Sequence, residues 1–216
     1  MWLLRLSSHT REPMDRILVA GLDPAFAAFG ISRLWLDLNT LEFEFDRFRT
    51  IWTEKLAGKK KQIRQNSDDL RRATELHDAL HEELDGCMVA FGEIPSGAQH
   101  ARSAYGFGVA VGVLASIKIP LIQVMPVETK LASVGSKTAE KPEIIAWAAE
   151  RFPEAPWQRY EADTKNKKGE IVNRAGDLHV GNEHVADACA VSHAGIRTPE
   201  FKQLLALWKA TRPTHG

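Results

Sequence analysis

Two short apolar runs, RILVAGLD at residues 16–23 and CMVAFGE at residues 87–93, most constrain how this chain can fold. Neither run shows the alternation of apolar and polar residues that marks a half-exposed strand, and each ends on a carboxylate, Asp23 or Glu93. Such runs are typical of strands that are buried on both faces of a sheet. Because both faces then need covering helices, the sequence predicts an α/β fold.

The segments around these runs indicate the rest of the sheet. Residues 31–38 are a second strand candidate, and residues 41–46 alternate apolar with acidic side chains. The short junction between them suits a hairpin, which predicts an antiparallel meander for the first three strands. Periodic apolar residues predict helices over 67–86, 99–117, 138–152, 183–196 and 199–210, with a buried strand over 120–126. The predicted architecture is a mixed five-stranded sheet, with three meander strands, then strand-helix alternation, and helices on both faces.

The helix over 67–86 has the clearest local signals. Leu70 and the apolar residues that follow it recur at helical spacing, with Ser67 to cap the start and Gly86 to end the helix. The helix over 138–152 has Thr138 or its neighbours as the cap.

Composition excludes several classes of protein. The chain has 216 residues, of which 44% are hydrophobic and 26% charged, as expected for one globular domain. Its 28 basic and 28 acidic residues balance, so nucleic-acid binding would need local clusters of positive charge. Lys118 and Pro120 interrupt the longest apolar run, which argues against a membrane span. Cys87 and Cys189 lack metal-ligand spacing and suggest no disulfide framework, so we expect a reducing, cytoplasmic setting.

Four side chains stand out as candidates for chemistry. A carboxylate at the end of a buried strand is costly unless it is solvated, paired or bound to a cation, and this applies to Asp23 and Glu93. Taken singly, each acid also has a simpler explanation. Asp23 before a proline is a common turn residue, and a Glu at a strand end, such as Glu93, is usually exposed to solvent. His184 and Asp187 are three residues apart on a predicted helix and therefore project from one face. An exposed first helical turn is the alternative for this pair.

If the two strand ends and this helix converge, three carboxylates and an imidazole form one site. Oxygen-rich sites of this kind suit Mg²⁺, with Mn²⁺ as a substitute. Two such ions, with Asp23 between them, suit the hydrolysis of a phosphodiester. Glu93 would hold one ion and Asp187 the other, with His184 as a ligand or a base that orients water.

Four motifs in this order, GLDPAFAAFGIS, AFGEIPSG, PVETKLASVGSKTAEKPEI and EHVADACAV, resemble the RuvC-type Holliday-junction resolvases of the RNase H-like superfamily. A phage or prophage version of such an enzyme is one interpretation. The resemblance implies an RNase H-like nuclease domain over residues 17–196, with a polar loop insertion at 153–182. A flexible lead-in over 1–16 precedes it, and a C-terminal helix and tail over 197–216 follow. It also implies a homodimer that nicks four-way or other branched DNA symmetrically.

The resemblance assigns roles residue by residue. The acids of the family fall on Asp23, Glu93 and Asp187, and His184 stands where many members have a fourth acid. Two lysines that approach phosphates match Lys130 and Lys141, for which a solvated helix surface is the alternative.

The same resemblance draws attention to segments that differ in length. Two segments are longer than in compact bacterial enzymes: the basic loop with Lys59, Lys60 and Lys61, and the insertion at 153–182. Each segment is either a DNA contact or a loop exposed to solvent. The aromatic wedge that follows the second acid in the family is missing here. Gly106, Gly108 and Gly112 lie in the charge-poor helix whose counterpart forms the dimer interface, so we expect them to allow close approach of a partner.

Two other functions stay open. GLDPAFAAFG also resembles the phosphate loop of the actin, Hsp70 and sugar-kinase ATPase fold, although that fold needs a second loop and a second domain. The neutral charge, the missing wedge and His184 are compatible with a branched-DNA-binding protein that has no nuclease activity.

Overall fold

The computed structural model describes residues 15–55, 65–95, 97 and 100–211. Residues 1–14 of the predicted lead-in lie outside this part of the chain, as do Lys59, Lys60 and Lys61.

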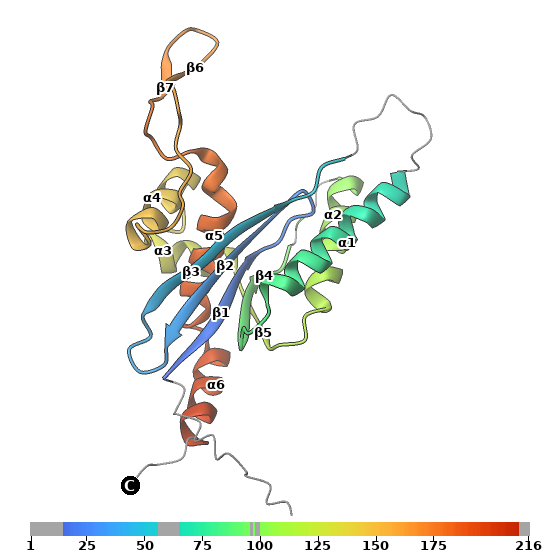
Figure 1. Ribbon diagram of the computed structural model, residues 1–216, viewed down its shortest axis with the longest axis vertical. Helices are drawn as coiled ribbons and strands as arrows, with labels where there is room; N and C mark the ends of the chain where they lie inside the picture. Colours follow the sequence, from blue (N-terminus) through green and yellow to red (C-terminus); the bar gives the residue numbers. More distant parts are fainter. Residues whose placement is uncertain (1–14, 56–64, 96, 98–99, 212–216) are drawn as a thin grey trace, which may run out of the picture.

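A five-stranded sheet with strand order β3-β2-β1-β4-β5 forms the centre of the molecule (Figure 1). Its strands are β1 (Arg16–Asp23), β2 (Ala28–Asp37), β3 (Phe43–Trp52), β4 (Val89–Glu93) and β5 (Leu121–Val124). The first three pair antiparallel, and β4 and β5 extend the sheet parallel to β1. The predicted mixed sheet is therefore confirmed, including the meander.

Helices cover both faces of this sheet, as the sequence predicts (Figure 1). One layer consists of α1 (Gln65–Glu83) and α2 (Ala101–Ala115). The other consists of α3 (Pro126–Ser133), α4 (Lys141–Arg151) and α5 (Glu183–Gly195), and α6 (Pro199–Ala210) follows at the end of the molecule. None of the helices in the described ranges is long and apolar enough to cross a membrane.

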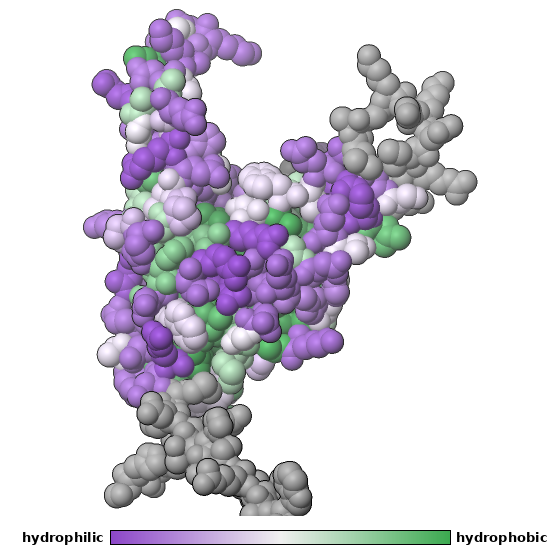
Figure 2. Space-filling view, viewed as in Figure 1, coloured by the Kyte–Doolittle hydropathy of each residue, from purple (hydrophilic) through white to green (hydrophobic). Residues whose placement is uncertain are grey.

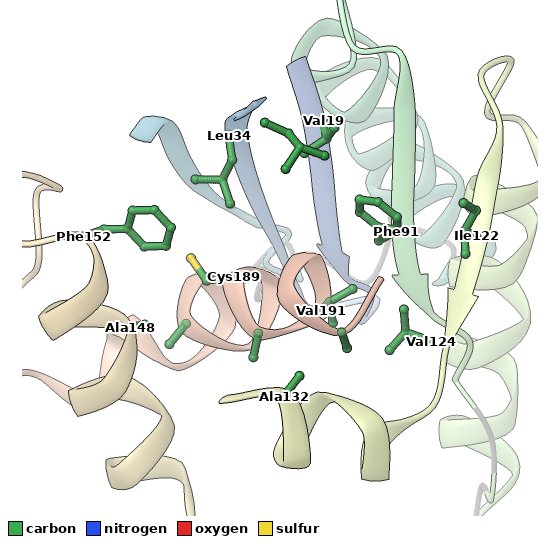
Figure 3. Close-up of a cluster of buried hydrophobic side chains, with 14 of the residues drawn as sticks. Val19, Leu34, Phe91, Ile122, Val124, Ala132, Ala148, Phe152, Cys189 and Val191 are labelled. Carbon is green, nitrogen blue, oxygen red and sulfur yellow. The ribbon is translucent and has the colours of Figure 1, made fainter. Parts of the chain in front are cut away.

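The two layers explain why β1 is apolar throughout. Because side chains alternate along a strand, Val19 packs toward α5 while its neighbours Leu18 and Ala20 pack toward α1 and α2. Figure 3 shows the α5 side of the core, where Val19 and Phe91 lie over the helix that carries Cys189. Both cysteines are free and buried.

Two local predictions for α1 are wrong. Leu70 is 68% exposed, because the buried face of α1 carries Asp69 and Arg72 instead, and Asp69 forms ion pairs with Arg72 and Arg102. Helix α1 begins at Gln65, so Ser67 lies inside its first turn.

The cap of α4, predicted at Thr138 or its neighbours, is Glu140, and Pro142 lies in the first turn. The backbone N–H of Glu140 donates a hydrogen bond to the side chain of Glu143. Helix α3 has no counterpart among the predicted elements. It starts with Pro126, and Glu128 accepts a hydrogen bond from the backbone of Met125, a capping arrangement typical of a helix start.

The insertion at 153–182 is more ordered than the predicted loop. It contains a two-stranded hairpin, β6 (Thr164–Lys165) and β7 (Ile171–Asn173), followed by the short helix η1 (Val180–Asn182). Polar composition concealed this order, because a hairpin that projects from the body has no buried face to produce an apolar pattern.

Candidate active site

Asp23 and Glu93 end two neighbouring strands at the same edge of the sheet. Strands β1 and β4 are parallel, and Leu22 pairs with Gly92. Asp23 and Glu93, the next residue in each strand, therefore lie side by side. Residues 19 and 21 of β1 and residues 89 and 91 of β4 face α5, and the two-residue alternation places both carboxylates on that same face.

Helix α5 crosses this face at unusually short range. A Cβ atom at Gly30 would collide with the carbonyl oxygen of His184, and one at Gly21 would collide with that of Ala188. The hydroxyl of Ser32 donates a hydrogen bond to the Ala188 carbonyl at 2.9 Å. These two glycines let the helix lie directly on β1 and β2, which brings His184 and Asp187 next to Asp23.

Hydrogen bonds hold three of the four side chains in place, those of Asp23, His184 and Glu93. His184 donates from Nδ1 to Oδ2 of Asp23 at 3.0 Å, and both side chains are about three-quarters buried. Thr129 of α3 donates from Oγ1 to Oε1 of Glu93 at 2.6 Å. The ring of Trp52 meets the His184 ring edge to face with centroids 5.5 Å apart, although Trp52 itself is 58% exposed. We call Asp23, Glu93, His184 and Asp187 the carboxylate site.

Negative charge in the carboxylate site is poorly compensated. Burial raises the pKa of Asp187 to about 7, and repulsion from Asp23, Glu183 and Glu93 adds to this effect. Burial also raises the pKa of Glu93, against the hydrogen bond from Thr129. The hydrogen bond to Asp23 raises the pKa of His184, which therefore favours its cationic form. A site that raises the pKa of its acids in this way favours a bound cation.

Two lysines lie at the rim of the carboxylate site, as their motifs suggest. Lys141, the first residue of α4, forms an ion pair with Glu183, which raises the pKa of the lysine, and the charges of Asp187 and Asp23 add to this. Lys130 is partly buried on α3, and its charge acts on Glu93 to oppose the rise of that pKa.

A pocket of about 240 Å³ opens between the two strand ends. Asp23 and Glu93 line it together with Phe107 of α2 and Pro126 of α3. A larger cavity, of about 630 Å³, lies along residues 158–164 and includes none of the four predicted site residues, so size does not mark the site here.

The donor set of the carboxylate site fits a hard divalent cation, since it offers carboxylate oxygens and one imidazole. Within the part of the chain that the structure describes, no three His, Cys, Asp or Glu side chains are already arranged as a metal-binding cluster. His184 instead occupies one oxygen of Asp23, and Thr129 occupies one of Glu93. Each of these carboxylates keeps its other oxygen for a cation, since an ionised carboxylate accepts through both oxygens.

Some residues of the site were not predicted from the sequence. Thr129 lies inside the PVETK motif, and the Pro126 and Glu128 capping signature was the signal for its helix. Glu183 immediately precedes His184, but only the fold shows its pairing with Lys141. Trp52 reaches His184 because β3 continues six residues beyond the predicted strand end at 46.

The strand order, the mixed pairing and the helix that crosses the strand ends define an RNase H-like fold. Among solved structures, RuvC of Thermus thermophilus in complex with a Holliday junction substrate matches with a TM-score of 0.56 at 18% identity, covering 82% of this chain and 92% of that one. Another Thermus thermophilus RuvC structure matches with a TM-score of 0.54 at 17% identity, covering 88% of this chain and 97% of that one. The yeast mitochondrial Holliday junction resolvase Ydc2 matches with a TM-score of 0.51 at 14% identity, covering 90% of this chain and 84% of that one.

The TM-scores, each above 0.5, establish a common fold. Neither a protein-family profile nor a curated protein sequence matches the chain. The RNase H-like fold expected from the four motifs is confirmed.

Stability in the absence of divalent cations is expected to fall as the pH rises from about 4 to about 7. Asp187 has a pKa of about 7 in the folded protein against a usual value of 3.8, so the folded state holds a proton that the unfolded chain has lost. Urea unfolding in EDTA at several pH values measures this. Asp187→Asn should remove part of the fall, because an amide does not titrate, and should stabilise the protein at pH 7 but not at pH 4. Equal pH dependence of the two proteins would contradict the burial of this acid.

Proposed function

We propose that this protein is a metal-dependent, structure-selective endonuclease that resolves Holliday junctions and other branched DNA by paired, symmetric nicks. The observation that carries the proposal is the convergence of Asp23, Glu93 and the His184–Asp187 pair at one edge of an RNase H-like sheet. The Holliday junction in one of the neighbouring structures supports the choice of substrate.

In this proposal, Asp23, Glu93, Asp187 and His184 hold Mg²⁺, with Mn²⁺ as a substitute and two ions in each site. Bound there, the ions would activate the attacking water and stabilise the leaving oxygen of the phosphodiester. The chain itself positions the ligands. Thr129 orients Glu93, and the Asp23 hydrogen bond orients the His184 ring. Lys130 and Lys141 supply positive charge where a DNA phosphate would approach.

We also propose a homodimer that forms through the outer face of α2. Tyr105 and Val111 are exposed there, and a Cβ at Gly108 or Gly112 would meet open space. Gly106 has a different role from the one expected, since it is buried and packs against Phe26 of the same chain. Two active sites in one dimer would account for paired nicks.

Incubation of the protein with a plasmid that extrudes a cruciform tests this function. With Mg²⁺ we expect linear product from paired nicks at the four-way junction, and none in EDTA. Nicked circles alone would indicate a single active site at the junction and would argue against the dimer. A linear duplex of the same sequence is the control, and equal cleavage of it would contradict selectivity for branched DNA.

A branched-DNA-binding protein without nuclease activity is the second candidate. The observation that favours it is that the described residues hold no ready-made metal cluster. It predicts junction binding that is unaffected by Mg²⁺ and intact DNA in the plasmid assay.

A further inference from the structure

The hairpin arm, residues 158–179, is a two-stranded ribbon that projects from the body of the protein (Figure 1). Backbone hydrogen bonds between Gln158 and His179 and between Tyr160 and Asp177 form its stem. The rings of Tyr160 and His179 meet across the stem at a tilt of 53°, with centroids 4.5 Å apart. At about 3.3 Å per residue, the tip at Asn166 lies at most about 20 Å beyond Tyr160.

The tip of the arm has a defined turn. Asn166 pairs with Glu170 through the backbone, and its side-chain oxygen accepts hydrogen bonds from the backbone amides of Lys168 and Glu170. Gly169 adopts a φ of 84°, which a three-residue hairpin loop requires at this position. Lys167 and Lys168 are therefore presented at the end of a preformed turn rather than on a flexible loop.

The charges of the arm are divided along its length. In the stem, Asp163 and Asp177 accept hydrogen bonds from the backbone amides of Ala175 and Arg174. Toward the tip, Lys165, Lys167 and Lys168 face a single acid, Glu170, which is engaged by the Asn166 amide. Among the described residues, none of these three lysines forms an ion pair. The tip is thus locally basic on a chain with no net charge, and Figure 2 shows mainly hydrophilic side chains over this arm.

The base of the arm is joined to the carboxylate site. The side chain of Asn182, which is buried, exchanges two hydrogen bonds with the backbone of Gln158. Asn182 immediately precedes α5, whose first turn carries His184. The stem is therefore held at a fixed place relative to α5.

We propose that the hairpin arm enters a groove of a duplex arm beside the site of cleavage, with Lys167 and Lys168 bound to its phosphates. A two-stranded ribbon fits the major groove of B-DNA, and a basic tip complements the phosphate backbone. The exposed Ile171 and Val172 on β7 supply an apolar surface for contact with the groove. This inference rests on the proposed function, since it takes branched DNA as the ligand.

The test compares the wild type with the double variant K167A/K168A. The matched control is K202A/K209A, because these lysines are also exposed but lie on α6 at the opposite end of the molecule (Figure 1). Binding of a fluorescent four-way junction is measured with Ca²⁺ in place of Mg²⁺ at several salt concentrations. K167A/K168A should bind about fivefold to thirtyfold more weakly at low salt. Its plot of log affinity against log salt should be less steep by about two units for each protomer.

Cleavage at saturating protein with Mg²⁺ separates this role from catalysis. The single-turnover rate of K167A/K168A should stay close to that of the wild type, because neither lysine lies in the carboxylate site. If the wild type binds and cleaves while K167A/K168A has unchanged affinity and salt dependence, the arm proposal fails and the proposed function stands. Equal losses of junction affinity in K202A/K209A would also overturn the arm proposal. A wild type that neither binds nor cleaves junctions would overturn the proposed function and the arm proposal together.

Discussion

Asp23→Asn and Asp187→Asn are each expected to reduce junction cleavage at least about a hundredfold while junction binding persists. An amide keeps the shape of the side chain but removes the negative charge that would hold a divalent cation. Electrostatic stabilisation by such an ion is worth several kcal/mol, and each 1.36 kcal/mol changes a rate tenfold. Single-turnover cleavage in Mg²⁺ and anisotropy binding in Ca²⁺ measure the two effects separately.

A matched control for this experiment is Asp85→Asn. Asp85 is exposed in the turn after α1, on the layer that lies across the sheet from α5, so its loss should leave cleavage unchanged. Full cleavage by Asp23→Asn or by Asp187→Asn would contradict the assignment of the active site. Loss of both binding and cleavage would instead indicate that the substitution disturbs the fold, which far-UV circular dichroism would reveal.

Gly21→Ala is expected to lower the free energy of unfolding by about 3 kcal/mol or more, at the upper end of the range for overpacked cores. The added methyl group would collide with the carbonyl oxygen of Ala188 and with the hydroxyls of Ser32 and Ser192. Backbone atoms of a helix cannot move aside alone, so α5 as a whole would have to shift away from β1. Urea unfolding followed by circular dichroism measures the change.

Gly92→Ala is the matched control for Gly21→Ala, since it also adds a methyl group inside a central strand. Its nearest contact is the end of the Leu121 side chain at 3.3 Å, which can rotate, so we expect a loss within about 1 kcal/mol. If Gly21→Ala proved as stable as the wild type, α5 could not lie on β1 as described. The convergence of His184 and Asp187 with Asp23 would then be in question as well.

Local patterns in the sequence were sufficient for most of the sheet and for the helix that carries His184 and Asp187. The run at 16–23 coincides with β1, and the predicted helix over 183–196 differs from α5 by one residue. Apolar periodicity reports only whether a side chain is buried, so it misassigned Leu70, whose neighbours bury an ion pair instead. It also missed the hairpin arm, where turn chemistry at Asn166 and Gly169 replaces burial.

By itself, the sequence determined which residues could do chemistry and which elements carry them, because residue type and short-range periodicity are local properties. Only the tertiary structure decided that Asp23, Glu93 and α5 meet on one face, since this depends on parallel register between distant strands and on the close approach at Gly21 and Gly30. The raised pKa of Asp187 has the same origin, because burial and neighbouring charges exist only once the chain has folded.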